Sequence, residues 1–219
     1  MIVVFLGPPG CGKGTQASFL NKAFGFYHLS TGDEIRNEIR EKTPLGLQIA
    51  EPYERGELLS DKIVLEIVEK IIAKHATKSI LFDGFPRTLP QAQSLDDVLG
   101  KHHLQVDAVI SFSVDDDLIV QRVLGRIVCG SCQSVYNTYT NPTKESGVCD
   151  HCGSQNFIRR TDDTEDALKT RLDLYKKTIE PVKEYYIKKE KLVNIDASKG
   201  AGEVTQSLLM DLNIVEQGE

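Results

Sequence analysis

The sequence predicts an α/β protein built on a doubly wound parallel sheet. Short, continuously apolar runs typical of buried strands alternate with segments of helical periodicity. A glycine-rich turn joins the first such strand to the first helix. Over 219 residues this alternation gives one core domain that is large enough to bury a sizeable hydrophobic core. Two stretches, about 30–59 and 125–162, interrupt the alternation, and we interpret both as insertions.

The elements follow from local patterns. Strands are expected at 2–6, 79–83, 108–112 and 192–195. Helices are expected at 13–23, 61–76, 115–124, 164–178 and 202–212, and Pro181 should end or bend the fourth of these. The first insertion is helical and charged with no strand pattern, and Thr31 with Glu34 forms a capping box that would open its first helix. The second insertion is poor in helix formers.

Composition excludes several classes of protein. The formal net charge is −6, with 40% hydrophobic and 26% charged residues, which is unlike a disordered chain. The acidic balance argues against non-specific nucleic-acid binding, and no apolar run is long enough for a membrane helix. The chain starts without the pattern of a signal peptide, so we expect a cytoplasmic protein. No coiled-coil pattern or exposed apolar stripe argues for assembly, so we expect a monomer.

Residues 7–15, GPPGCGKGT, form a phosphate-binding loop between the first strand and the first helix. The glycines let backbone N–H groups turn toward an anion, and Lys13 supplies a mobile charge for the β- and γ-phosphates. The usual Ser or Thr after the lysine is replaced by Gly14, and Thr15 comes one position later. Asp83 ends a strand, where it could hold Mg²⁺ through water or act as a turn or cap residue.

Four cysteines form two C-x₂-C pairs separated by 16 residues: Cys129, Cys132, Cys149 and Cys152. This spacing predicts a closed tetrahedral Zn²⁺ site with a structural role. His151 could compete with Cys152 as the fourth ligand, but the second C-x₂-C spacing favours Cys152. Thiolates alone leave Fe²⁺ or Co²⁺ open as the metal.

Three runs together resemble the adenylate kinases: residues 7–15, Ser30-Thr31-Gly32-Asp33, and Asp83-Gly84-Phe85-Pro86-Arg87 with Gln91. The Gly14-Thr15 ending is what that family shows. The resemblance spans residues 1 to about 212. It implies a P-loop NTPase-like CORE (1–29, 60–124 and 163–219), a helical NMP-binding insertion (30–59) and a zinc-ribbon-like LID (125–162).

The resemblance also implies an activity: reversible phosphoryl transfer from MgATP to AMP giving two ADP, in nucleotide homeostasis. Residues matching the family's ATP contacts are Gly10, Cys11, Gly12, Lys13, Gly14, Thr15, Arg122, Arg126, Val135, Tyr136 and Lys199. Those matching its AMP contacts are Thr31, Arg36, Glu57, Leu58, Leu59, Gly84, Phe85, Pro86, Arg87, Gln91, Arg160 and Arg171. The implied catalytic set is Lys13, Asp83, Arg87, Arg126, Arg160 and Arg171. Asp162 and Asp163 would orient Arg160 and LID groups when the LID closes, would cap the following helix, or would do both, and Arg159 is left without a role.

The chemistry suits these residue types. Phosphoryl transfer between two nucleotides crowds negative charge around one phosphorus, and guanidinium groups both neutralise and orient it. The attacking phosphate oxygen of AMP is already deprotonated near neutral pH, so no general base is needed. Cys11 stands where the family usually has Ala or Ser, either as a tolerated small residue or as a redox-sensitive thiol.

Other functions remain open at this point. A sibling kinase would use UMP, CMP or GMP as acceptor, although Thr31, Gln91 and the long zinc-type LID favour AMP. A zinc-ribbon binding module would need a more basic second insertion than 125–162 provides. A GTPase switch would need a guanine-selecting Asn/Thr-Lys-x-Asp run, which the sequence lacks.

Overall fold

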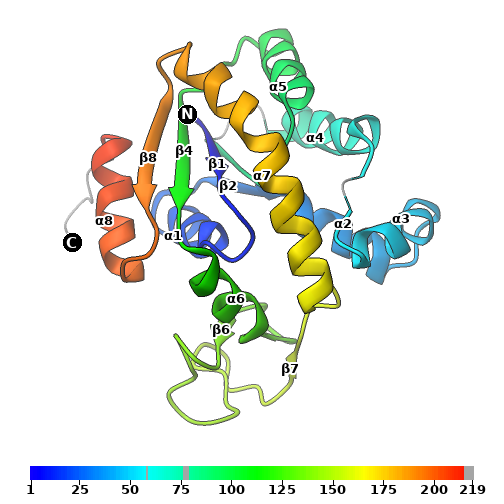
Figure 1. Cartoon of the computed structure of the whole chain (residues 1–219), viewed down its shortest axis with the longest axis vertical. Coiled ribbons are helices and arrows are strands. Elements are labelled where there is room, and N and C mark those ends of the chain that lie inside the picture. Colours follow the sequence, from blue (N-terminus) through cyan, green and yellow to red (C-terminus); the bar gives the residue numbers. More distant parts are fainter. Residues whose placement is uncertain (58, 76–78, 215–219) are drawn as a thin grey trace.

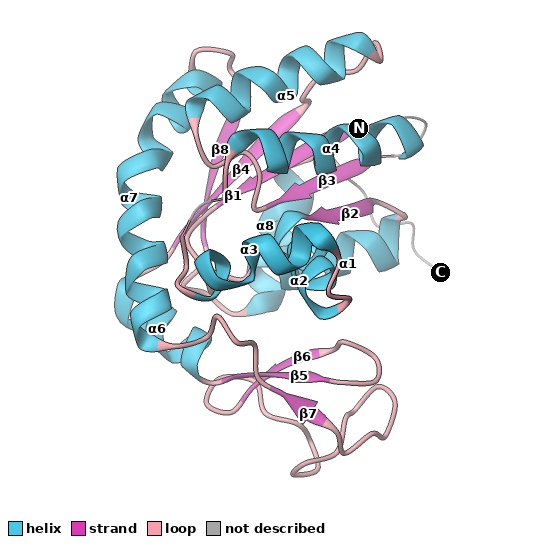
Figure 2. Ribbon diagram, turned by 90° about the vertical axis from the view of Figure 1, so that its right-hand side faces the viewer, coloured by secondary structure: helices cyan, strands magenta, loops and turns pink. Residues whose placement is uncertain are grey.

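The computed structural model describes residues 1–57, 59–75 and 79–214. Its large sheet has five parallel strands in the order β2 (Tyr27–Ser30), β3 (Ile80–Asp83), β1 (Ile2–Leu6), β4 (Ala108–Ser113) and β8 (Leu192–Asp196). Helices lie on both faces of this sheet (Figure 1), which confirms the predicted doubly wound α/β class. A smaller antiparallel sheet, β6 (Val135–Asn137), β5 (Arg126–Cys129) and β7 (Phe157–Ile158), lies apart from it (Figure 2).

The two faces of the large sheet have separate hydrophobic cores. Helices α1 (Lys13–Phe24) and α8 (Ala201–Asp211) cover one face, and α4 (Asp61–His75), α5 (Leu89–Lys101) and α7 (Glu165–Ile187) cover the other. Strand β1 is buried along its whole length, with Val3 and Phe5 in the first core and Ile2, Val4 and Leu6 in the second. This two-sided burial explains why the strand is continuously apolar rather than alternating.

The first insertion folds as two packed helices, α2 (Thr31–Arg40) and α3 (Pro44–Glu54). The helix α2 is capped by Ser30, whose hydroxyl accepts from the Asp33 amide, so the predicted cap at Thr31 is wrong by one residue. Thr31 is helical and its side chain turns inward instead. Helix α6 (Asp116–Leu124) leads into the small sheet and packs against α7.

Three differences from the sequence prediction concern the large sheet and its cover. The edge strand β2 was not predicted, because only Leu29 of its four residues is fully buried and the strand pairs on one side only, so it has no continuous apolar run. Helix α5 was not predicted either; it starts at a Thr88 cap with Pro90 in its first turn. Pro181 does not end α7, which continues to Ile187. Beyond it Val182 and Tyr186 are fully buried against the sheet, and this burial outweighs the roughly 3 kcal/mol that an interior proline costs.

Within the described ranges, no helix combines the length and apolar character needed to cross a bilayer.

Candidate active site

The carboxyl ends of three neighbouring strands bring the predicted motifs together. Strand β1 runs into the glycine-rich loop, and in the sheet register Asp83 on β3 pairs with Phe5 on β1 and with Ser30 on β2. The loop, the Ser30–Asp33 run and the run that starts at Asp83 therefore meet at one edge of the sheet. This is where open parallel sheets bind ligands.

The glycine-rich loop wraps the start of α1. Gly12 precedes the helix in a left-handed conformation (φ 105°), which leaves the first helical N–H groups facing the loop. Gly10 also has a positive φ, and a Cβ there would lie 2.6 Å from the side chain of Val123 on α6. The Lys13 ammonium donates to the carbonyls of Gly7 and Pro8 at 2.7 and 2.9 Å, across the mouth of the loop. Lys13 is thus held where it would meet an incoming phosphate.

Gly14, Thr15 and Cys11, which depart from the usual sequence of such loops, differ in their exposure to solvent. Gly14 and Thr15 are exposed, and a Cβ at Gly14 would lie 3.8 Å from the Asp83 carboxylate. Cys11 is buried in the core under α1 and α8, with its Sγ 3.5 Å from the Lys13 ammonium.

Asp83 is largely buried, with its side chain 14% exposed, and its carboxylate lies 3.3 Å from His28 Nε2. Burial acts to raise the pKa of Asp83, but the hydrogen bond from His28 and the charge of Lys13 outweigh it and lower the pKa. Asp83 is therefore an ionised carboxylate beside the phosphate loop.

A pocket opens between α2, α3, the start of α4 and the segment after β3. Its lining residues are Thr31, Ile35, Tyr53, Glu57, Leu59, Val64, Gly84, Arg87 and Gln91. Six of these nine belong to the predicted AMP contacts, which come from three separate stretches of sequence. Thr31 donates to the Gly84 carbonyl at 3.1 Å, and Arg87 Nε donates to the same carbonyl at 2.7 Å.

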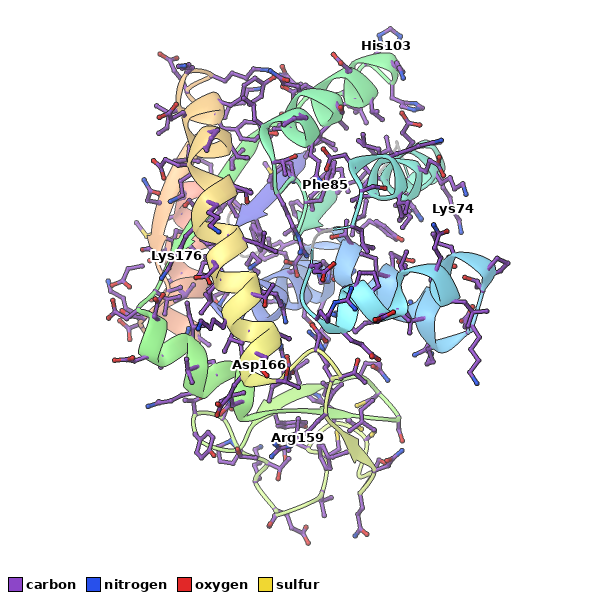
Figure 3. All side chains as sticks on the ribbon, turned by 45° about the vertical axis from the view of Figure 1, so that its right-hand side comes forward. Lys74, Phe85, His103, Arg159, Asp166 and Lys176 are labelled. Atoms are coloured by element: carbon purple, nitrogen blue, oxygen red, sulfur yellow. The ribbon has the colours of Figure 1, made fainter. Side chains whose placement is uncertain are left out.

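Phe85 and Pro86, two further predicted AMP contacts, do not line this pocket. Phe85 and Pro86 are buried, and Figure 3 shows Phe85 inside the molecule. The Phe85 ring packs near Phe82 in the core, with centroids 6.4 Å apart. Leu58 falls outside the described residues.

Five arginines converge beside this pocket: Arg36, Arg87, Arg126, Arg160 and Arg171. Burial and then the nearby Arg126 and Arg36 lower the pKa of Arg160 to about 10. Burial and then Arg171 likewise lower the pKa of Arg87. Grouping cations so closely is unfavourable unless an anion joins them, so the cluster is suited to bind phosphates.

Aspartates hold four of these arginines. Arg126 is bound through two nitrogens by Asp163, with Nε at 2.7 Å from Oδ2, and Arg171 is 2.8 Å from Asp162. The carboxylate nearest to Arg160 is that of Asp33, 3.7 Å away, and Asp33 also pairs with Arg36.

Of the predicted partners of Asp162 and Asp163, Arg160 is paired with Asp33 in this structure, whereas Arg126, a residue of the predicted second insertion, is held by Asp163. These two carboxylates orient Arg171 and Arg126. The other predicted role, capping of α7 by these two acids, is wrong, since its cap is Thr164. Arg159 is exposed beside the small sheet (Figure 3).

The remaining predicted ATP contacts are more dispersed. Arg122 Nη1 donates to the carbonyls of Ala197 at 2.8 Å and Cys11 at 3.3 Å, which ties the phosphate loop to the segment after β8. Lys199 is exposed in that segment, and Val135 is exposed on β6. The Tyr136 side chain is buried inside the small-sheet segment.

The four paired cysteines are free thiols, and their sulfur atoms lie within 4.8 Å of one another. Cys129 and Cys152 are 3.6 Å apart, and Cys132 and Cys149 are 3.5 Å apart. A tetrahedral zinc site with Zn–S bonds of ~2.3 Å separates its sulfurs by about 3.8 Å, so the group fits such an ion. The Tyr136 hydroxyl lies 3.4 Å from Cys149 Sγ, and this hydrogen bond lowers the pKa of the Cys149 thiol.

Sequence reasoning did not assign roles to four residues that shape the site. Tyr53 accepts from Arg36 Nη1 at 2.6 Å, His28 contacts Asp83, Asp33 joins two arginines, and Asp61 holds Gln91. Only Asp33 carried a signal, because it ends the Ser30–Asp33 run. The other three act through contacts across 17 to 55 positions of sequence, which no local pattern reports.

Comparisons with known proteins agree with this geometry. The family model described as adenylate kinase matches residues 5–191. The chain is 43% identical over 209 residues to an adenylate kinase of Carboxydothermus hydrogenoformans, covering 95% of this chain and 97% of that protein. It is 46% identical over 187 residues to one of Paracoccus denitrificans, covering 85% of each chain. It is 42% identical over 210 residues to one of Borreliella burgdorferi, covering 95% and 97%.

Proposed function

The chain belongs to the adenylate kinase family, and from that membership we propose which of its residues perform each part of the reaction. The reaction is the transfer of a phosphoryl group from ATP to AMP, with Mg²⁺ accompanying ATP. The observation that carries the assignment is the convergence of five arginines, one of which, Arg87, lines the pocket together with Thr31 and Gln91.

The donor nucleotide is assigned to the phosphate loop. Residues 10–15 offer backbone N–H groups at the start of α1, and Lys13 adds a full charge on the same side. Arg122 holds the loop to the segment after β8, so we assign it a positioning role for the loop. Asp83, ionised and close to Gly14, would hold Mg²⁺ through water beside the ATP phosphates.

The acceptor is assigned to the pocket between α2, α3, the start of α4 and the segment after β3. Arg36 and Arg87 reach the phosphate of AMP, while Thr31, Leu59 and Gln91 lie against its base. The phosphate oxygen of AMP attacks directly, because it carries no proton that a base would have to remove. Arg126, Arg160 and Arg171 then neutralise the charge on the transferring group.

The aspartates that hold these arginines keep the site assembled before substrate arrives. Asp33 contacts Arg36 from the first insertion and Arg160 from the end of the second. Nucleotide phosphates replace such carboxylates with more highly charged partners. Closure of 125–162 (LID) over bound nucleotides would exclude water and so prevent hydrolysis of ATP. The division into CORE, NMP-binding insertion (30–59) and LID is part of this proposal.

A structural zinc ion is assigned to the four LID cysteines. Beside the cysteines the LID core holds little more than Tyr136, Ile127 and Phe157, so metal bonds would supply most of its stability. Removing the ion with a chelator should lower the melting temperature of the LID while the CORE still melts cooperatively at a higher temperature. A calorimetric trace that is the same with and without chelator, together with no metal by elemental analysis, would reject the assignment.

The function is tested by ADP formation from ATP with AMP, UMP, CMP or GMP in turn, with and without Mg²⁺. AMP should be the preferred acceptor by a wide margin, and ATP alone should be hydrolysed slowly. Equal rates with and without a monophosphate, or a preference for another base, would contradict the proposal.

We also propose that the protein acts as a monomer in the cytoplasm. Four free thiols in one cluster persist in a reducing compartment. Sedimentation equilibrium and cell fractionation test these two points.

A further inference from the structure

The Gln91 side chain lies in the acceptor pocket with both ends of its amide already bound by the protein. Its Oε1 accepts from the Arg87 backbone N–H at 2.7 Å, and its Nε2 donates to Asp61 Oδ1 at 2.6 Å. Gln91 is 2% exposed, and it lines the pocket with Thr31 and Leu59.

These two partners fix which way round the amide sits. A backbone N–H can only donate and a carboxylate can only accept, so neither partner tolerates an exchange of the oxygen and nitrogen positions. If the amide flipped, its NH₂ group would face the Arg87 N–H, a donor against a donor, and its oxygen would face the Asp61 carboxylate, an acceptor against an acceptor. The orientation of Gln91 is therefore set by chemistry, whereas an isolated glutamine could turn to suit its ligand.

A fixed amide still has one N–H and one lone pair to offer a base. Adenine presents an amino donor at C6 beside the N1 acceptor, and guanine presents the reverse, a carbonyl acceptor at C6 beside the N1–H donor. An amide that is free to flip matches either purine equally well. An amide locked in one orientation matches only one of them.

We infer that Asp61, with the backbone N–H of Arg87, locks the Gln91 amide and so makes the acceptor site select adenine over guanine. Asp61 is the first residue of α4 and is absent from the pocket lining, so it is a positioning residue that acts through Gln91. The inference rests on the proposed acceptor site.

A tie between α4 and α5 is the other role that these contacts could serve. Asp61 Oδ2 also lies 3.5 Å from the Thr88 hydroxyl, which caps α5. Loss of a tie would lower stability and weaken both purines alike. Loss of the lock changes their ratio, so selectivity separates the two roles.

The test is Asp61→Asn, which keeps the size of the side chain but can accept or donate. In this variant a flipped Gln91 amide can accept from the side-chain amide at position 61 and lacks a partner only at the Arg87 N–H. The flipped amide, which suits guanine, therefore becomes less unfavourable. The ratio of kcat/KM for GMP to that for AMP should rise about tenfold. The change should come mainly from a lower KM for GMP, with kcat for AMP nearly constant. The matched control is Asp96→Asn on α5. The Asp96 carboxylate does not line the pocket and accepts a hydrogen bond of 2.8 Å from the Tyr185 hydroxyl. The GMP-to-AMP ratio of kcat/KM in this variant should equal that of the wild type.

Gln91→Leu supplies the second arm. It removes the selecting amide, so adding Asp61→Asn to it should cause no further change in the GMP-to-AMP ratio. Additive effects, or an unchanged ratio in Asp61→Asn alone, would overturn the inference.

If Asp61→Asn does not fold, nuclear magnetic resonance of the wild type decides. The Gln91 side-chain NH₂, assigned by its absence in Gln91→Leu, should show one proton shifted downfield by the Asp61 carboxylate and protected from exchange. Two ordinary shifts would refute the lock. A wild-type enzyme that does not use AMP would contradict the proposed function itself, which these arms distinguish from failure of the lock.

Discussion

The packing of α2 against α3 depends on the absence of a side chain at Gly46. A Cβ built there would lie 2.0 Å from the Glu38 carbonyl oxygen and 2.4 Å from its carbon. Close C···O contacts in proteins are about 3.3–3.6 Å, so in Gly46→Ala the two helices must separate by more than ~1 Å. Both obstructing atoms belong to the backbone of α2 and cannot rotate aside.

The cost and the consequence follow from this geometry. Overpacking lowers the free energy of unfolding by about 1–3 kcal/mol. We expect Gly46→Ala near the upper end of this range, because the obstacle is backbone and cannot move aside. Helix α2 carries Arg36, and α3 carries the Tyr53 hydroxyl that accepts from it at 2.6 Å. A separation of ~1 Å breaks that bond. We expect KM for AMP to rise about tenfold, equivalent to roughly 1.4 kcal/mol, while KM for ATP stays within twofold.

The two KM values are measured from steady-state ADP formation, first with the AMP concentration varied and then with the ATP concentration varied. Calorimetry measures the stability of the variant. The matched control is Gly202→Ala in α8, where a Cβ would meet nothing within 4 Å. In that variant the free energy of unfolding should rise by about 0.4–1 kcal/mol, and KM for AMP should be unchanged. If Gly46→Ala showed wild-type KM for AMP and wild-type melting temperature, the close contact between α2 and α3 would not exist as described.

Three further predictions concern the arginines, the metal site and pH. Arg126→Ala should lower turnover about 10³-fold in rapid-quench measurements, whereas Arg159→Ala, an exposed arginine, should leave it unchanged; similar losses in both would refute the assignment. Tyr136→Phe removes a hydrogen bond to Cys149 and should weaken zinc binding about tenfold in chelator competition, and equal affinities would exclude this role. The pKa of Asp83 is lowered in the folded state, so its carboxylate contributes stability above its ordinary value of 3.8 and loses that contribution as pH falls through the lowered pKa. Free energies of urea unfolding for wild type and Asp83→Asn should therefore differ at pH 6 and converge toward pH 2; a constant difference would contradict this reasoning.

The elements that could be predicted from the sequence are those with strong local signals. Strand β1 was predicted with its observed bounds, since a strand buried on both faces is continuously apolar. Strand β2 has four residues and one neighbour, so its existence depends on pairing with β3 rather than on its own composition. Helix α7 runs through Pro181 because the sheet supplies the burial that the helix alone lacks.

The candidate site divides in the same way. The phosphate loop and the cysteine pairs are predictable because their chemistry lies within a few consecutive residues. Partners could not be predicted where they come from distant elements, as with Asp163 for Arg126 or Asp61 for Gln91. Tyr136 was matched to an ATP contact by its place in the sequence, yet its hydroxyl lies beside the Cys149 thiol.

The sequence by itself determined the α/β class, the anion-binding loop and the residue types that phosphoryl transfer requires, because backbone conformation and ligand spacing are local properties. Only the tertiary structure decided which carboxylate holds which arginine and which way the Gln91 amide is turned. Those choices depend on distances of a few ångströms between segments far apart in the chain, and such distances are set by packing.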